Sequence, residues 1–304
     1  MSKISFNNKV AVITGAAQGL GREYAKLLAS LGAITIINDI ATDEDGNPLA
    51  NKVVNEIIKG GGHAIANTNN IACKEGITGL IKAVEESYGA IDILIHNAGV
   101  FVDKPFLQFE DRDWYDVINI HLNGSYHLLK AIIPLMRQRN YGRIIMITSS
   151  VGMYGMANHA SYGAAKMGVY GLVQSLKLEL EDTEIKCNLV SPLAATGQTS
   201  YALNKELHKQ LDVEMVAPLV AYLASEECTH NGSTFVAGGG YFSSVGIFEG
   251  GGVYIPKEKL SIESIFGNIS QITDLSMGVH ISSTGQSAKK IFRKIFSGRR
   301  ANKQ

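Results

Sequence analysis

Seven short apolar runs, separated by amphipathic segments, constrain the fold of this chain more than any other feature. The runs are continuous rather than alternating, and they occupy residues 10–15, 33–39, 63–70, 91–99, 143–150, 185–192 and 233–240. Continuous runs are typical of strands that are buried on both faces. Helical periodicity fills the segments between them, near residues 19–31, 49–59, 74–88, 110–139, 160–181 and 213–225. This order predicts an α/β fold with a doubly wound, mainly seven-stranded parallel sheet and helices on both faces.

The alternation of strands and helices stops after Gly240. Residues 241–262 include a glycine-rich piece, and the remainder reads as a short helical extension with a basic tail. The 304 residues exceed the usual domain size of roughly 100–150 residues, but an α/β fold can use about 250 in one piece. We therefore expect one domain over residues 1–245 and a C-terminal extension over residues 246–304.

Composition favours small-molecule partners over nucleic acid. The 28 basic and 28 acidic residues balance, so the chain lacks the basic excess of a nucleic-acid binder. The three cysteines are far apart and no histidine lies in a ligand-spaced cluster, so we expect no disulfide framework and no metal. No signal-like segment or apolar stretch of about 18 residues occurs, and the chain does not end in Ser-Lys-Leu. We expect a cytoplasmic protein without stable membrane insertion.

A glycine-rich turn, TGAAQGLG, follows the first predicted strand. Gly15 can form the tight turn, Gly19 lets the backbone approach a phosphate, and Gly21 allows the next helix to pack closely. The N-terminus of that helix presents free N–H groups to a pyrophosphate. The pattern predicts a Rossmann-type dinucleotide site that also includes Gln18 and Leu20.

Asp39 ends the second predicted strand, about 20 residues beyond the glycines. A carboxylate at this place can accept hydrogen bonds from ribose hydroxyls, whereas a 2′-phosphate would meet a like charge. Gln18 is neutral and supplies no cation for such a phosphate. We therefore expect NAD rather than NADP, with a simple turn residue beside Asn38 as the alternative role of Asp39.

Tyr162 and Lys166 stand four residues apart in SYGAAKMG, with small residues between them. Such residues share one face of a helix. The spacing alone is weak evidence, because Tyr126 with Lys130 and Tyr201 with Lys205 repeat it. What distinguishes Tyr162 must lie in its surroundings.

Ser149 supplies that distinction, since it ends a strand thirteen residues before Tyr162. A serine there and a Tyr–Lys pair on the next helix can converge on one substrate oxygen. Tyrosine has a pKa of roughly 10, and we expect the Lys166 ammonium and a nearby nicotinamide cation to favour the phenolate. Ser150 is the competitor for the role of Ser149, and spacing favours Ser149.

These motifs, together with HNAG at residues 96–99, resemble those of the short-chain dehydrogenase/reductase family over roughly residues 7–240. The resemblance implies that Tyr162 is the catalytic acid/base, Ser149 the donor to the substrate oxygen, and Lys166 the ribose anchor. It also implies cofactor contacts from Asn70, Ile71, Asn97 and Gly99.

His121 departs from the general family pattern, which has an asparagine that completes a proton relay at this place. A packed core histidine is the simpler interpretation. The same histidine is typical of one subgroup, the (3R)-hydroxyacyl-CoA dehydrogenase part of peroxisomal multifunctional enzyme type 2. Other stretches resemble that subgroup to about residue 287, so the resemblance implies a catalytic site that includes His121.

The sequence therefore predicts NAD-dependent interconversion of (3R)-3-hydroxyacyl-CoA and 3-oxoacyl-CoA, a step of fatty acid metabolism. The alternatives are a 3-oxoacyl-acyl-carrier-protein reductase, a steroid or secondary-alcohol dehydrogenase, and a non-catalytic NAD(H)-binding protein. The family resemblance implies a homodimer or homotetramer built on the long helices. The basic tail, with Ile291, Phe292, Ile295 and Phe296 at helical spacing, is expected to be solvated, with an anionic membrane or CoA phosphates as alternatives.

Overall fold

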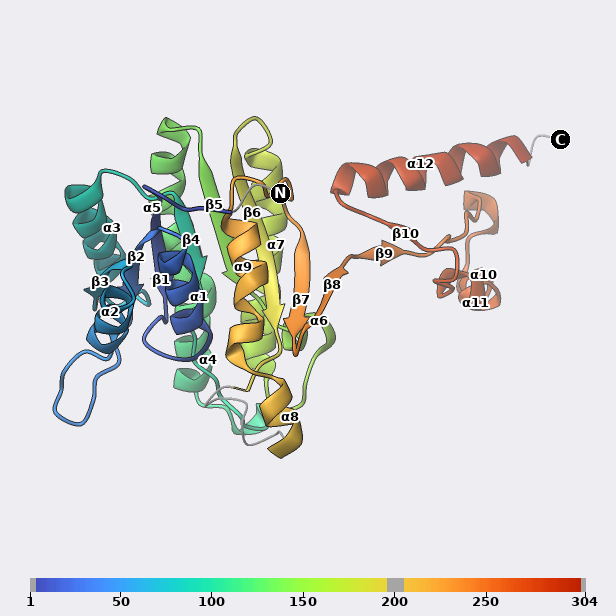
Figure 1. Ribbon diagram of the computed structural model, residues 1–304. Coiled ribbons are helices and arrows are strands. Elements are labelled where there is room, and N and C mark those ends of the chain that lie inside the picture. Colours follow the sequence, from blue (N-terminus) through green and yellow to red (C-terminus); the bar gives the residue numbers. More distant parts are fainter. Residues whose placement is uncertain (1–3, 196–204, 302–304) are drawn as a thin grey trace. The chain divides into compact units, whose positions relative to one another are not determined.

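A computed structural model describes residues 4–195 and 205–301 (Figure 1). Within these residues one sheet has eight strands in the order β3-β2-β1-β4-β5-β6-β7-β8. Strands β1 to β7 pair in parallel. The strand order reverses between β1 and β4, so the ligand crevice of such a fold lies beyond the carboxyl ends of these two strands. The strands are β1 Val10–Thr14, β2 Ile34–Asn38, β3 His63–Asn67, β4 Ile93–His96, β5 Gly142–Ile147, β6 Ile185–Pro192, β7 Thr234–Gly238 and β8 Tyr241–Val245.

The predicted seven strands are all present, and β8 was not expected. Only Gly239 and Gly240 separate β8 from β7, and both have positive φ angles, 56° and 79°. A two-residue connection of this kind makes an antiparallel hairpin, because a parallel crossover needs about a dozen residues. The sheet is therefore mainly parallel with one added edge strand.

Helices cover both faces of the sheet (Figure 1). Each predicted helical segment contains a helix, but residues 110–139 form α4, a π-helical turn over Asn119–Asn123, and α5. The short helices α6 and α8 were not predicted, since each spans less than two turns. The helices are α1 Gly19–Ser30, α2 Ala50–Lys59, α3 Lys74–Tyr88, α4 Asp111–Ile118, α5 Gly124–Gln138, α6 Ser150–Tyr154, α7 Ala160–Glu179, α8 Lys205–Gln210 and α9 Ala217–Ala224.

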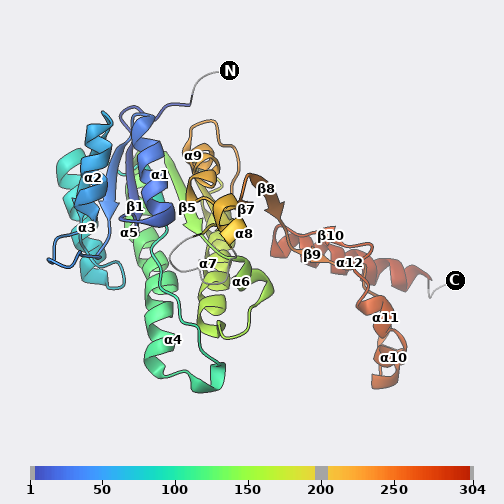
Figure 2. The ribbon, with the colours of Figure 1, turned by 60° about the horizontal axis from the view of Figure 1, so that its bottom comes forward.

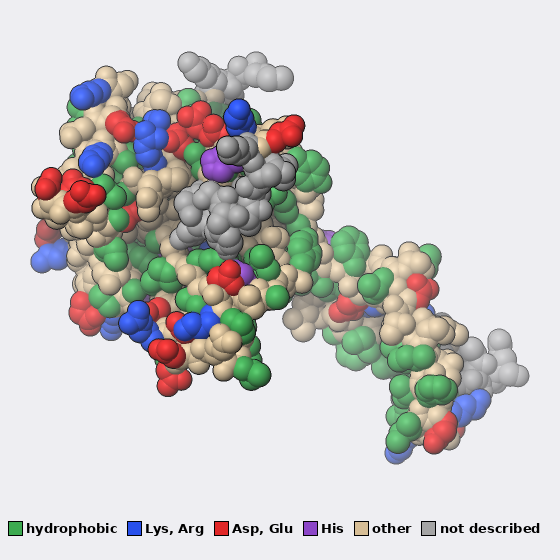
Figure 3. Space-filling model, turned by 90° about the horizontal axis from the view of Figure 1, so that it is seen from below, with side chains coloured by type: hydrophobic (Ala, Val, Ile, Leu, Met, Phe, Trp, Pro, Cys, Tyr) green, Lys and Arg blue, Asp and Glu red, His purple; other side chains and the backbone are tan. Residues whose placement is uncertain are grey.

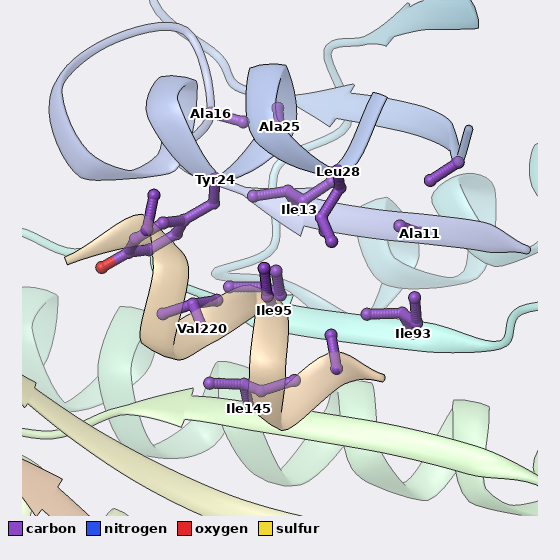
Figure 4. Close-up of a cluster of buried hydrophobic side chains, with 14 of the residues drawn as sticks. Ala11, Ile13, Ala16, Tyr24, Ala25, Leu28, Ile93, Ile95, Ile145 and Val220 are labelled. Carbon is purple, nitrogen blue, oxygen red and sulfur yellow. The ribbon is translucent and has the colours of Figure 1, made fainter. Parts of the chain in front are cut away.

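Two hydrophobic clusters, one on each face, hold the sheet between these helices. Alternate residues of a strand point to opposite faces, so Ile13 joins the cluster with α1 and α9 while Val12 joins the cluster with α3 and α5. Figure 4 shows the first cluster, where Leu28 of α1 and Val220 of α9 approach Ile95 of β4. These fully buried layers fix the strand ends that carry the polar residues described below.

The chain divides into two compact units, Met1–Ser244 and Val245–Gln304, and the second contains the C-terminal extension. Glu249 accepts hydrogen bonds from Ser287 at 2.7 Å and Lys290 at 3.2 Å, which join β9 to α12. The surface of the unit Val245–Gln304 carries large apolar side chains (Figure 3). Among them are Ile262, which is 84% exposed, and Phe266, which is 79% exposed. Its elements are β9 Phe248–Glu249, α10 Ile262–Gly267, α11 Ile269–Ile272, β10 Val279–His280 and α12 Thr284–Ala301 (Figure 2).

The basic tail is thus largely the helix α12. No helix in the described parts of the chain is both long and apolar enough to cross a membrane.

Candidate active site

The glycine turn between β1 and α1 has the geometry that a dinucleotide phosphate requires. Gly15 and Gly19 have positive φ angles of 63° and 54°, which favour glycine. A Cβ atom on Gly15 would lie 2.6 Å from the Cα of Ala98, and one on Gly21 would lie 2.2 Å from the Gly15 carbonyl oxygen. Gln18 is the N-cap residue and Leu20 lies in the first turn of α1. These close approaches fit a pyrophosphate beside the backbone at the helix N-terminus.

Asp39 directly follows β2 and is tied to the glycine turn. Its Oδ2 accepts the Ala17 N–H at 3.0 Å, and its Oδ1 accepts the Ala41 N–H at 3.0 Å. The carboxylate therefore has the expected place beside the turn, and it also serves as a local turn residue. Its neighbour Asn38 is buried and bonds instead to Asn67 and the Asn69 carbonyl, both at 2.9 Å.

Asn70 and Ile71 lie between β3 and α3. Asn70 is exposed and its Oδ1 accepts the Ala72 N–H at 2.9 Å. Ile71 is 5% exposed and belongs to the cluster on the α3 side of the sheet. Both residues follow the carboxyl end of β3, and Asp39 follows the carboxyl end of the neighbouring strand β2. Their contact with adenine stays a prediction.

Thr14, which was not predicted as a site residue, joins the glycine turn to HNAG. Its Oγ1 accepts the N–H groups of Asn97 and Ala98, both at 3.1 Å, and lies 2.8 Å from Nδ1 of His96. Asn97 donates in turn to the Gly15 carbonyl at 2.9 Å. Both acceptor positions of the hydroxyl are used, so its hydrogen goes to Nδ1 and His96 carries its own proton on Nε2.

His96, at the end of β4, is 4% exposed. Burial, together with the nearby Lys166 charge, lowers its pKa to about 3. The imidazole is therefore neutral and acts as a fixed hydrogen-bonding link at the switch point. In the sequence, His96 is the first residue of HNAG, and nothing there distinguishes it from an ordinary core histidine.

Ser149 and Tyr162 meet, as the spacing predicted. Ser149 is the N-cap of α6, where its Oγ accepts the Val151 N–H at 3.1 Å, and it is a hydrogen-bond partner of the Tyr162 phenol. Ser150 is exposed. The geometry therefore favours Ser149 over Ser150 beside the phenol.

Lys166 follows one turn later on α7 and is 3% exposed. Its Nζ donates to the Ile147 carbonyl at 2.6 Å and lies 5.5 Å from the centroid of the Tyr162 ring. One donor position is used at Ile147, and the ammonium form has two more. These remaining donors suit the hydroxyls of a ribose.

In the protein without a bound cofactor, the pKa of the Tyr162 phenol is shifted upward from its ordinary value, and the expected effect of the nicotinamide cation stays a prediction. Burial raises the pKa of the phenol, and the hydrogen bond from Ser149 only partly opposes this rise. Burial also lowers the pKa of Lys166 to about 7. Desolvation is therefore the largest cause of both pKa shifts in the protein alone.

The Lys166 pKa predicts that stability rises with pH. The folded amine loses its proton near pH 7, whereas the ordinary value is 10.5. Between these values the unfolded chain binds more protons, so the free energy of unfolding of the ligand-free protein should rise by up to about 1.4 kcal/mol per pH unit. Urea unfolding from pH 7 to 9 measures this slope, and Lys166→Met should remove it. Equal slopes for the two proteins would contradict the assignment.

His121 lies on the π-helical turn and is 3% exposed. Its ring stands at 88° to the Tyr162 ring, with 5.1 Å between the centroids. Its Nε2 lies 2.8 Å from the Val100 carbonyl oxygen and 3.2 Å from the Val100 N–H. A Cβ atom on Gly99 would approach its Cε1 to 2.2 Å, so Gly99 makes room for the imidazole.

Burial, with the Lys166 charge, holds the pKa of His121 well below its usual value. The imidazole is therefore neutral beside the phenol. The structure brings His121 into the site, although its catalytic role stays a prediction.

The second Tyr–Lys pair differs from this arrangement. Lys130 donates to the Tyr126 hydroxyl at 3.0 Å on an exposed surface, where Tyr126 is 44% exposed. Tyr201, of the third pair, lies outside the described residues. Ser149 and His121 thus distinguish Tyr162 from Tyr126.

A glycine turn for a dinucleotide and a Ser–Tyr–Lys set, both at the carboxyl ends of a parallel sheet, define an oxidoreductase that uses a nicotinamide cofactor. Residues 9–210 match the family model described as short chain dehydrogenase. The chain belongs to the short-chain dehydrogenase/reductase family.

Several proteins are similar over most of the chain. A putative short-chain type dehydrogenase/reductase of Mycobacterium tuberculosis is 39% identical over 88% of this chain and 95% of its own length. Peroxisomal multifunctional enzyme type 2 of Drosophila melanogaster is 35% identical over 94% of this chain, which spans 48% of that enzyme. The solved structure of the Drosophila enzyme has a TM-score of 0.81 at 31% identity and covers 95% of this chain and 50% of its own.

Two further proteins are similar over a smaller share of this chain. The 3-oxoacyl-[acyl-carrier-protein] reductase FabG of Haemophilus influenzae is 33% identical over 78% of this chain and 99% of its own length. A metagenomic short-chain oxidoreductase solved with NADP has a TM-score of 0.64 at 29% identity, and covers 74% of this chain and 96% of its own.

Proposed function

We propose that this oxidoreductase interconverts (3R)-3-hydroxyacyl-CoA and 3-oxoacyl-CoA with NAD. The observation that carries the proposal is the extent of similarity to the multifunctional enzymes. Similarity to the Drosophila enzyme covers 94% of the chain, whereas similarity to the Haemophilus reductase covers 78%. The part shared with the Drosophila enzyme includes residues of the C-terminal extension, because the uncovered 6% of the chain is shorter than residues 246–304.

The site residues support proton transfer at one substrate oxygen. When bound, the oxidised nicotinamide supplies the hydride acceptor. The Tyr162 phenolate takes the proton of the C3 hydroxyl as the hydride leaves C3, so that the C–O bond becomes a carbonyl. Ser149 donates a hydrogen bond to the same oxygen and so stabilises its changing charge. Lys166 holds ribose hydroxyls and places a positive charge near the phenolate.

Asp39 supports the choice of NAD. Its carboxylate lies beside the glycine turn, where ribose hydroxyls can donate to it and a 2′-phosphate would be repelled. The similar short-chain oxidoreductase that was solved with NADP is 29% identical to this chain. At that identity its cofactor does not decide which cofactor this chain uses, so we base the choice on Asp39.

Stereochemistry tests the proposed function. Purified protein is mixed with NAD and each enantiomer of a 3-hydroxyacyl-CoA, and NADH formation is followed by absorbance. We expect turnover of the (3R) substrate at least about 100-fold faster than of the (3S) substrate, because hydride and hydroxyl must both face fixed groups. Equal rates, or no NADH from either enantiomer, would contradict the proposal. A parallel panel of steroids and simple secondary alcohols tests the alternative substrates.

Assembly and location stay predictions. We propose a homodimer or homotetramer built on α4–α5 and α7, since Tyr115, Met167 and Leu178 on these helices expose 57%, 41% and 51% of their surface. Light scattering measures the mass in solution. A cytoplasmic location is likewise proposed.

A further inference from the structure

His159 lies one helical turn before Tyr162 and is 2% exposed. Its carbonyl accepts the Gly163 N–H at 2.8 Å, and it is the N-cap residue of α7. Its ring centroid lies 4.4 Å from that of Phe101, and Phe101 lies 5.1 Å from the ring of Tyr162. The three rings form a continuous row that ends at the phenol.

The hydrogen bond at Nδ1 fixes what the other nitrogen can do. Nδ1 of His159 lies 2.5 Å from the Ala157 carbonyl oxygen, and a carbonyl only accepts, so Nδ1 carries the proton. In the neutral ring Nε2 is then an acceptor. Nε2 is buried, and no group in the described parts of the chain bonds to it. A buried polar atom without a partner is costly, so a ligand with a suitable N–H or O–H would be favoured.

We infer that Nε2 of His159 accepts a hydrogen bond from the amide N–H next to the thioester in the substrate's pantetheine arm. This inference rests on the proposed function. The thioester carbonyl and sulfur offer no hydrogen to donate, and the first donor beyond them is this amide, six bonds from the hydroxyl-bearing carbon. The ring centroids in the row from Tyr162 through Phe101 to His159 are 5.1 and 4.4 Å apart, so the path along the row is of the same order as a six-bond chain. In this proposal the arm displaces Phe101, whose ring contacts the imidazole.

A pair of matched substrates tests the subsite. One is the N-acetylcysteamine thioester of a 3-oxoacyl group, which keeps the amide, and the other is the S-(4-oxopentyl) thioester, in which CH2 replaces the N–H. The wild-type protein should reduce the first about 10-fold more efficiently, measured as kcat/KM with NADH. His159→Phe keeps a ring of similar size but has no acceptor, so the preference should fall to within about 2-fold. His159→Gln supplies an amide oxygen and should retain most of the preference.

A binding measurement distinguishes a failure of this inference from a failure of the proposed function. Calorimetry with cofactor present measures the affinity of each thioester whether or not it is turned over. A preference for the amide that His159→Phe abolishes supports the subsite even if neither thioester is reduced. Equal affinity of the wild type for both, no binding of either, or an unchanged preference in His159→Phe would overturn it. Coenzyme A and acyl-carrier-protein thioesters of one acyl group, compared in the same assay, identify which source of the arm the protein uses.

Discussion

Replacing Tyr162 with Phe should lower kcat by about 1000-fold or more while cofactor affinity changes by less than about 3-fold. A positioned acid/base contributes roughly 100- to 10,000-fold to a rate, and Tyr162 is the proposed group that takes the substrate proton. The ring itself is retained, so its contacts with Phe101 and His121 should persist. NADH formation measures kcat, and titration calorimetry measures cofactor binding.

Tyr126 supplies the matched control, because it also precedes a lysine by four residues and bonds to it. Tyr126→Phe should leave kcat and cofactor affinity unchanged, since no serine or histidine of the site lies beside this exposed pair. Turnover by Tyr162→Phe near the wild-type rate would exclude the phenol as the acid/base.

Replacing Asp39 with Asn should lower the ratio of kcat/KM for NAD to that for NADP by about 100-fold, which corresponds to about 2.7 kcal/mol. Two like charges about 4 Å apart near a protein surface repel by roughly this order, and asparagine removes the charge while an oxygen can still accept the Ala17 N–H. Steady-state kinetics with both cofactors gives the ratio.

Glu44→Gln is the control for charge, since Glu44 is an exposed carboxylate five residues further along the chain. Its ratio should match that of the wild type. A wild-type protein that uses both cofactors equally, or an unchanged ratio in Asp39→Asn, would show that Asp39 does not select the cofactor.

The sequence predicted the parallel sheet because continuous apolar runs and strand–helix alternation are local signals. It also predicted the meeting of Ser149 with Tyr162, since a strand end and the following helix have few ways to converge. It did not reveal β8, whose run YFSSV is partly polar and whose two-glycine turn differs from the preceding crossovers. The π-helical turn was also missed, because a single wide turn hardly changes the helical period.

The properties of the histidines needed three-dimensional information. The His96 tautomer depends on a hydroxyl from β1 that accepts two N–H groups, and the sequence separates these residues by about 80 positions. The upward shift of the Tyr162 pKa in the protein without cofactor was not predicted, because a charge partner can be read from spacing, whereas desolvation depends on burial. Burial at this site comes from elements distant in the sequence.

The apolar surface of residues 245–304 has a practical consequence for handling the protein. Ile262, Phe266 and Met277 expose 84%, 79% and 77% of their surface, and such patches promote self-association. A fragment cut to this segment should precipitate during expression unless detergent is added. Replacing these three side chains with polar ones should therefore reduce self-association of both the fragment and the full chain.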